Sequence, residues 1–227
     1  MATATDAVTI EIDGGVKGSP NITRDQGGEA TVTITSTGAA NAVGKIDLDT
    51  GSAIKSVTID AATKLTAGLV AGDYAANSTL TLKGAGAIDL SAAALAANIT
   101  TVNAADSAGG VSVIMGANTA KFTGGAGNDT VSAGALVFNS TGSLNGGGGT
   151  NTLVLQDEAQ LTSTTVAKMT NFQVLRLNDD NDNGLDTFNS SLISGLTGLV
   201  VGAQAGGDSV KVTNISLNPQ VDRSKTS

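Results

Sequence analysis

The chain has no cysteine and no histidine among its 227 residues, and aromatic side chains are rare. Without cysteine it forms neither a disulfide nor a thiolate metal site. Without histidine it lacks the commonest general base and the commonest ligand of transition metals. Aromatic residues make up only 2% of the sequence, so Val, Ile, Leu and Ala must build the core, which suits thin, layered packing.

Positive charge and long apolar runs are also scarce. The chain has 12 Lys and Arg against 20 Asp and Glu, a net charge of −8. This balance argues against a nucleic-acid partner, whose phosphates need a basic face, and fits carboxylates that meet Ca²⁺ or salty water. No apolar run reaches about 18 residues, so the sequence predicts no membrane insertion. The start, MATATDAV, shows no Sec signal.

Glycine is abundant, with 30 residues, and short apolar segments alternate with polar ones. Val8, Ile10 and Ile12 alternate with polar side chains, and so do Val32 and Ile34. Alternation with a period of two, rich in Val, Ile and Thr, predicts β-strands. The chain is therefore expected to be an ordered, all-β protein with many turns.

A longer period begins near residue 54. Short strands recur at Val57, Leu80, Thr101, Phe122 and Leu144, with spacings of 23, 21, 21 and 22 residues, each followed by a small or polar corner. Second strands are expected between them, at 87–91, 111–115 and 136–139. Two strands and two turns in each period predict a right-handed parallel β-helix or β-roll solenoid. A β-sandwich with regular hairpins is the alternative.

Composition suggests three segments: an N-terminal β segment over 1–53, the solenoid with its repeats over 54–217, and a polar tail over 218–227. Two stretches have helix-forming residues, 91–97 and 160–169. Both are short for a stable helix, so they are expected to be short helical insertions that decorate the solenoid.

One stretch follows a known calcium-binding pattern. Residues 124–132 read GGAGNDTVS, and 22 residues later 146–154 read GGGGTNTLV, with Asn151 where the first copy has Asp129. The G-G-x-G-x-D-x-U-x pattern turns a parallel solenoid and binds Ca²⁺ between stacked corners. Ca²⁺ takes six to eight oxygens, mixing carboxylates with carbonyls. Glycine corners without a metal are the alternative. The predicted ligand or turn positions are Gly125, Gly127, Asp129, Gly147, Gly149 and Asn151.

A second candidate calcium loop is acidic. Asp179, Asn181 and Asn183, followed by Gly184, fit the start of a calcium loop, although Ser190 stands where Glu is required. No long helices flank the loop, so it is not an EF-hand; Asp182 and Asp186 are possible substitute ligands. A solvated acidic turn is the alternative. Solvated charges at strand edges are the better interpretation of a third set, Asp47, Asp49 and Asp60.

The sequence does not predict an enzyme. Tyr74 and the serines lack a histidine partner. Carboxylate pairs for glycoside chemistry stay open, but such enzymes usually line a sugar groove with aromatic side chains. Thr-x-Thr pairs (Thr31 and Thr33, Thr33 and Thr35, Thr79 and Thr81) suggest an ice-binding solenoid. Read along the sequence, however, these pairs form no unbroken array at one coil position.

The segments KFTGGAGNDTVSAG, SLNGGGGTNTLVLQD and TNFQVLRLND together resemble the Gram-negative surface-layer proteins that carry RTX-type calcium-binding repeats. In that family a G-F-E-x-L-x-L strand follows the repeats. The run from Asn171 to Leu177 matches this element, with Gln173 in place of Glu.

The resemblance implies an extracellular, cell-surface lattice protein. Its relatives leave the cell by type I secretion, fold on meeting Ca²⁺, assemble with copies of themselves and attach to lipopolysaccharide through other segments. The expected function is therefore a structural segment of a calcium-dependent surface layer. A segment of an RTX adhesin that binds surface glycans is the alternative.

Overall fold

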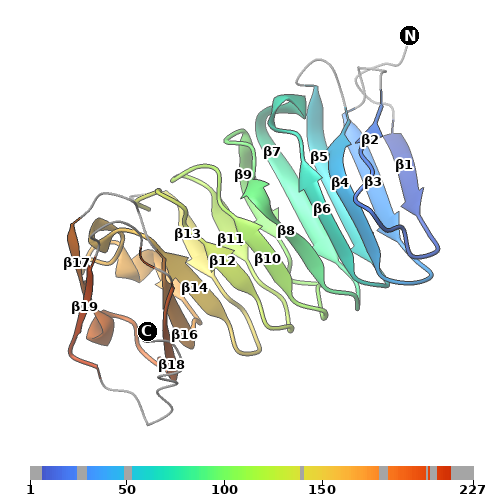
Figure 1. Cartoon of the computed structure of the whole chain (residues 1–227). Coiled ribbons are helices and arrows are strands. Elements are labelled where there is room, and N and C mark those ends of the chain that lie inside the picture. The colour runs from blue at the N-terminus through green and yellow to red at the C-terminus, as the bar shows by residue number, and fades with distance from the viewer. Residues whose placement is uncertain are drawn as a thin grey trace.

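The computed structural model describes residues 7–24, 30–48, 53–138, 141–178, 184–202, 204 and 209–215. The chain winds into an elongated solenoid of about 8 turns, all-β apart from short 3-10 helices. Successive coils stack along one axis, and the N-terminal strands lie at the opposite end from the C-terminal strands (Figure 1). The predicted parallel β-solenoid is confirmed.

Each coil contributes one strand to each of two parallel sheets. The first sheet contains, in order, β1 (Ala7–Ile12), β3 (Thr31–Ser36), β5 (Ile54–Ala61), β7 (Tyr74–Lys83), β9 (Ile99–Asn103), β11 (Lys121–Thr123), β13 (Ser143–Asn145) and β15 (Met169–Thr170). The second sheet contains β2 (Ile22–Thr23), β4 (Asn41–Asp47), β6 (Leu65–Leu69), β8 (Ile88–Ala94), β10 (Val111–Ile114), β12 (Thr130–Ser132), β14 (Thr152–Leu155), β16 (Val174–Leu177) and β18 (Gly198–Val201).

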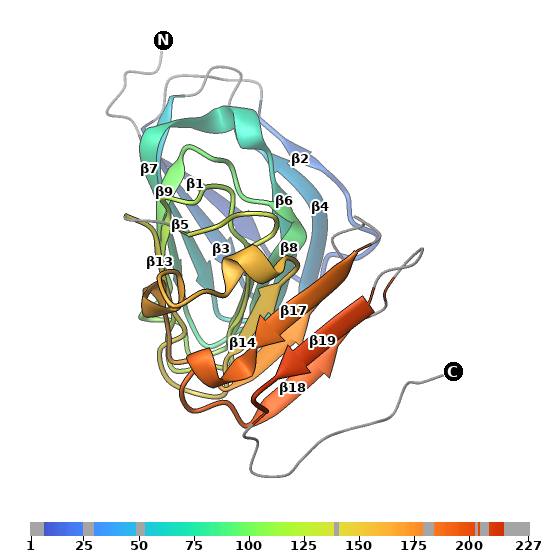
Figure 2. The ribbon, with the colours of Figure 1, turned by 90° about the vertical axis from the view of Figure 1, so that its left-hand side faces the viewer.

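The C-terminal coils depart from this plan. β17 (Leu185–Asn189) pairs with β19 (Ser209–Thr213) in a separate two-stranded sheet, while the second sheet continues through β16 to β18. Figure 2 shows β17 and β19 beside each other at this end of the solenoid. The first sheet thus ends at β15, one coil earlier than the second.

The core between the two sheets is made of apolar side chains, most of them aliphatic, and one column of them runs along the axis. Val57 pairs with Leu80, Leu80 with Val102, Val102 with Phe122 and Phe122 with Leu144, and all five are buried. These are the positions at which the sequence predicted a recurring strand, within one residue. The parallel ladder gives each strand inside a sheet a partner on both sides. The alternation of side chains directs every second one inward.

Strands before residue 53 belong to the same sheets as those after it. β3 pairs with β5 in register over six residues, from Thr31↔Ser56 to Ser36↔Ala61. Both sheets are therefore continuous across the place where the sequence suggested a change of segment.

Two local expectations are wrong. The alanine-rich stretch at 91–97 forms no helix, because β8 runs through Ala94, which pairs with Ile114 of the next coil. Pairing with neighbouring strands overrides helix propensity there. Within 133–138 there is no strand; the second strand of that coil is β12, inside the glycine nonapeptide itself.

The helical insertions are single 3-10 turns: η1 (Ala71–Asp73), η2 (Glu158–Gln160), η3 (Val166–Lys168) and η4 (Ser190–Leu192). The expected helix over 160–169 is broken between η2 and η3. There the backbone amides of Thr162 and Thr165 each donate a hydrogen bond to the other residue's hydroxyl group, and the two hydroxyl groups also form a hydrogen bond. Such local side-chain bonds compete with helix formation.

Candidate functional site

A column of equivalent positions runs along the solenoid where the second-sheet strands begin. Asn41 pairs with Leu65, Leu65 with Ile88 and Ile88 with Val111. Farther along, Ser112 pairs with Thr130, Thr130 with Thr152 and Thr152 with Val174. The residues that directly precede Thr130, Thr152 and Val174 therefore continue the column beyond Val111. We call its last three members, Asp129, Asn151 and Gln173, the polar column. The column is therefore polar at Asn41, apolar from Leu65 to Val111, and polar again at the glycine repeats.

Asp129 is buried, and its carboxylate accepts two backbone hydrogen bonds. Its Oδ1 accepts the amide of Val111 in the preceding coil at 2.7 Å, and its Oδ2 accepts the amide of Gly125 in its own corner at 3.1 Å. Burial raises the pKa of Asp129 above its ordinary value, and the two amide hydrogen bonds oppose this shift. The carboxylate thus fastens one coil to the next from inside.

Asn151 repeats this arrangement one coil later without a charge. Its Oδ1 accepts the amide of Asp129 at 2.9 Å, and its Nδ2 donates to the carbonyls of Gly148 at 2.9 Å and Asn171 at 3.0 Å. The side chain is fully buried. Every polar atom of this amide group therefore has a partner, as a buried polar group requires.

Gln173 closes the polar column. Its side-chain Oε1 accepts a hydrogen bond from the backbone amide of Asn151 at 2.8 Å, and its backbone amide donates to the Asn151 carbonyl at 3.0 Å. Each member of the polar column thus accepts the amide of the equivalent residue in the coil before it. The sequence singled out Gln173 only as a substitution in a family element; the 22-residue spacing from Asp129 to Asn151 to Gln173 was the signal of its role.

The predicted glycines lie where the backbones of adjacent corners approach each other. A Cβ on Gly125 would collide with the carbonyl of Ser107, and one on Gly127 with the amide of Gly110. Gly147 and Gly149 have positive φ of 76° and 78°, which favours glycine. The corners also bond to each other, since the Gly148 amide donates to the Gly125 carbonyl at 2.8 Å. The repeat therefore builds closely stacked corners.

The side chains of the polar column by themselves offer few oxygen ligands for a calcium ion. Ca²⁺ needs six to eight oxygens, and several are usually carboxylates. Both oxygens of Asp129 face N–H donors, and the Oδ1 of Asn128 accepts the Thr150 amide at 2.8 Å. Within the described part of the chain, no three Asp or Glu side chains gather into a group able to hold a metal. An ion here would share the Asp129 carboxylate with the amides of Val111 and Gly125.

The other acidic candidates lie elsewhere. Asp179, Asn181 and Asn183 fall outside the described residues. Asp186, a suggested substitute ligand, is buried in β17. Asp60 forms an ion pair with Lys83 at 2.9 Å on the solvent side of the first sheet, where both side chains are about 40% exposed. An exposed pair of this kind contributes little to stability.

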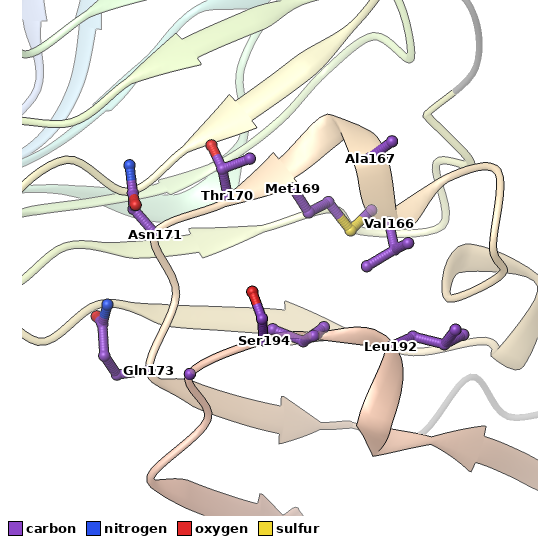
Figure 3. A pocket seen from close by; sticks show the side chains of 10 residues that line it. Val166, Ala167, Met169, Thr170, Asn171, Gln173, Leu192 and Ser194 are labelled. Carbon is purple, nitrogen blue, oxygen red and sulfur yellow. The ribbon is translucent and has the colours of Figure 1, made fainter.

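A cleft of about 510 Å³ opens where the first sheet ends. Figure 3 shows β15 and η3 on one side and the segment from Leu192 to Gly195 on the other. Met169 and Ile193 provide buried apolar surface, and Thr170, Asn171, Gln173 and Ser194 provide polar groups. The cleft exists because the second sheet continues to β18 while β15 is the last strand of the first sheet. Sequence reasoning missed it, since only the pairing reveals it.

Tyr74 is also placed away from solvent. It is 1% exposed, and burial, with the charge of Asp73 adding to it, raises the pKa of its hydroxyl. Its side chain belongs to the core. The lone tyrosine is thus a packing residue in the column between the sheets.

The chain has no significant match among family models, curated proteins or solved structures. Among the described residues, no helix has the length and apolar character needed to cross a membrane.

Proposed function

We propose that the chain is a rod-shaped structural segment of an extracellular surface layer, and that it assembles with copies of itself. The observation that supports this proposal is the pair of continuous parallel sheets, whose successive coils are also joined by buried side-chain hydrogen bonds at the glycine repeats. An elongated body with polar faces and a fixed repeat is suited to side-by-side packing. Attachment to lipopolysaccharide and type I export belong, in this proposal, to other segments.

The rod's stiffness follows from where its hydrogen bonds point. Strands of successive coils pair along the solenoid axis, so the backbone ladders of both sheets resist bending and stretching of the rod. The polar column adds side-chain bonds in the same direction, from Val111 through Asp129 and Asn151 to Gln173. A lattice component needs this kind of dimensional stability more than it needs a recessed reaction site.

Calcium binding remains a prediction from the sequence. A calcium titration followed by circular dichroism, on the wild type and on Asp129→Asn, separates the two candidate places. The hydrogen-bonded corner predicts a calcium response that is equal in the two proteins, which would place the ion away from Asp129 and leave the acidic loop at 179–183 as the other candidate. A weaker response in the variant would instead assign the ion to Asp129. No response in either protein would contradict calcium binding.

The alternative function, a glycan-binding adhesin segment, is favoured by the cleft. Hydroxyl and amide groups of Thr170, Asn171, Gln173 and Ser194 surround an apolar surface, a combination that suits a single sugar unit. Ser194 is exposed, so Ser194→Phe would fill the cleft with little effect on the core.

Electron microscopy of the purified chain at high concentration, together with a glycan array, tests these functions. A lattice segment forms ordered two-dimensional arrays, and Ser194→Phe leaves them intact. An adhesin segment stays monomeric and binds a sugar, and Ser194→Phe abolishes that binding. Monomers without sugar binding would contradict both functions.

A further inference from the structure

Two columns of solvent-facing side chains on the first sheet are in register and rich in hydroxyl groups, and we call these two columns together the hydroxyl face. A third solvent-facing column borders them and contains Glu11, Thr35 and the ion pair of Asp60 with Lys83. Column one contains, in coil order, Ala7, Thr31, Ser56, Thr79, Thr101, Lys121 and Ser143. Column two contains Thr9, Thr33, Thr58, Thr81, Asn103, Thr123, Asn145 and Thr170.

The hydroxyl face is polar but almost free of charge. Column two consists of six threonines and two asparagines, and the one charged residue in column one is Lys121. The neighbours that alternate with them, such as Val32, Ile34 and Val57, are fully buried, so the two columns point to solvent. The Thr-x-Thr pairs of β3 and β7 are separated by Ser56 on β5, so these pairs form no unbroken array, as the sequence indicated. Within column two, however, Thr33, Thr58 and Thr81 are direct neighbours.

The preference of threonine for strands does not explain this face, because the second sheet shows a different surface. Its corresponding column contains Ala42, Thr66, Asp89, Ser112, Thr130, Thr152, Val174 and Gly198. The adjacent positions include Ile114, Arg176 and Val200. Ser112, Thr130 and Thr152 are neighbours on the second sheet, but the column beside them contains Ile114, Ser132, Val154 and Arg176. Only the first sheet therefore presents hydroxyl groups in two adjacent columns.

The repeat distances of the hydroxyl face are fixed by the sheet. Neighbouring strands lie about 4.8 Å apart, and alternate residues on one strand about 6.7 Å apart. The pairing within both columns is unbroken; the register shifts near Ile54 and Ser78 lie before the columns begin. Hydroxyl and methyl groups thus form a two-dimensional lattice, whose spacings are close to those between oxygen atoms on a prism face of hexagonal ice.

We propose that the hydroxyl face binds ice. Each threonine hydroxyl donates and accepts a hydrogen bond, and each methyl group restricts the water held between the columns. One such contact is weak in water, but a ligand with the same repeat meets every coil at once. This proposal is independent of whether the rod assembles into a lattice.

Other occupants fit the hydroxyl face less well. The columns offer none of the aromatic or arginine side chains that anchor protein partners, and no aromatic side chain to stack on a sugar ring. Lys121 stands near one end, so the uncharged region covers both columns from β1 to β9. A regular, uncharged and hydroxyl-rich surface matches a lattice of water molecules better than a dissolved ligand.

The test is thermal hysteresis and ice-crystal shape for the wild type, Thr58→Lys and Thr130→Lys. Thr58 lies on β5, in the middle of the hydroxyl face between β1 and β9, and Thr130 is an equally half-buried, solvent-facing threonine on the second sheet. The proposal predicts hysteresis and faceted crystals for the wild type, loss of most of the hysteresis in Thr58→Lys, and retention in Thr130→Lys. Thr81→Lys provides a second variant in case Thr58→Lys fails to fold, as unfolding temperatures would show.

Two results would overturn the proposal. One is a wild-type hysteresis no greater than that of a non-binding protein of equal size and concentration. The other is an equal loss in variants of both sheets, which would make the effect unspecific. Retention on crystalline chitin or cellulose without any effect on ice would also contradict it, and would assign the hydroxyl face to a polysaccharide surface.

Discussion

Asn151 stands one coil after Asp129, and its Oδ1 accepts the Asp129 backbone amide at 2.9 Å, just as the Oδ1 of Asp129 accepts the amide of Val111 at 2.7 Å. An acid and its neutral counterpart thus perform the same task at successive levels of the rod. The Asn151 side chain also donates two hydrogen bonds to carbonyls, which a carboxylate cannot do. The polar column is therefore a structural feature that can be taken apart residue by residue.

Asn151→Ala should destabilise the fold strongly. It leaves the buried amide of Asp129 without its acceptor and removes the donor to the Gly148 and Asn171 carbonyls. Each buried group left unpaired costs about 1–3 kcal/mol. The control is Asn128→Ala in the same corner, where water can reach the exposed Thr150 amide; its effect should stay within about 0.5 kcal/mol. Equal losses in urea denaturation would contradict the buried role of Asn151.

Asp129→Asn should change how stability depends on pH. The pKa of Asp129 is raised in the fold, so the folded state binds its proton more tightly than the unfolded state. The stability contributed by this group is present below its unfolded pKa and is lost as the pH rises through its folded pKa. The free energy of unfolding of Asp129→Asn, relative to that of the wild type, should therefore increase as the pH rises from acid to neutral. Parallel stability curves for the two proteins would contradict this.

The exposed Asp106→Asn is the control for that experiment, because it removes the same charge at the surface. Its stability curve should follow that of the wild type at every pH. If the stability of Asp106→Asn, relative to the wild type, increased with pH as much as that of Asp129→Asn, the effect would reflect net charge and not burial.

Two glycines of the stacked corners should differ sharply in their tolerance of alanine. A Cβ on Gly124 would collide with the Gly146 carbonyl and with Oδ2 of Asp129, whereas one on Gly148 meets its nearest atom at 3.5 Å. Neither glycine has a positive φ, so backbone strain does not separate them. Gly124→Ala should cost about 1–3 kcal/mol through overpacking, and Gly148→Ala almost nothing. Thermal unfolding of both variants tests this, and similar melting temperatures would refute the close stacking.

Phe122→Ala should cost about 3–5 kcal/mol, since it empties a large buried site in the column between the sheets. The neighbouring Thr123→Ala changes an exposed side chain on the same strand, and its effect should stay within about 0.5 kcal/mol. Denaturant unfolding of the two variants distinguishes inward from outward positions. A large loss of stability in Thr123→Ala would show that Thr123, and not Phe122, faces the core.

The sequence predicted the fold from its apolar period because successive coils stack apolar residues on equivalent apolar residues. Val57, Leu80, Phe122 and Leu144 stood out for this reason, and they do form one buried column with Val102. The glycine repeats were likewise identified as corners. Their short strands were not, because three residues such as Thr130–Ser132 carry too little alternation to be distinguished from a turn.

The hydroxyl face could not be found by searching for a constant period. Paired residues of column two are separated by 20 residues between Asn103 and Thr123 and by 25 between Asn145 and Thr170, because the corners differ in length. Register is set by strand pairing and not by distance along the chain. The partners of Asp129 were hidden for the same reason, since the sequence does not show that the Val111 amide points at its carboxylate.

The register of the first sheet underlies the core column and the hydroxyl face, and thiol crosslinking tests it most directly because the chain has no native cysteine. Thr58→Cys combined with Thr81→Cys places two thiols on directly paired residues. Thr58→Cys combined with Thr79→Cys places the second thiol two residues away along the neighbouring strand, on the same face of the sheet. A short crosslinker should join the first pair rapidly and the second poorly, since paired strands lie only about 4.8 Å apart. Preferential joining of the second pair, or crosslinks only between molecules, would contradict the stacked solenoid.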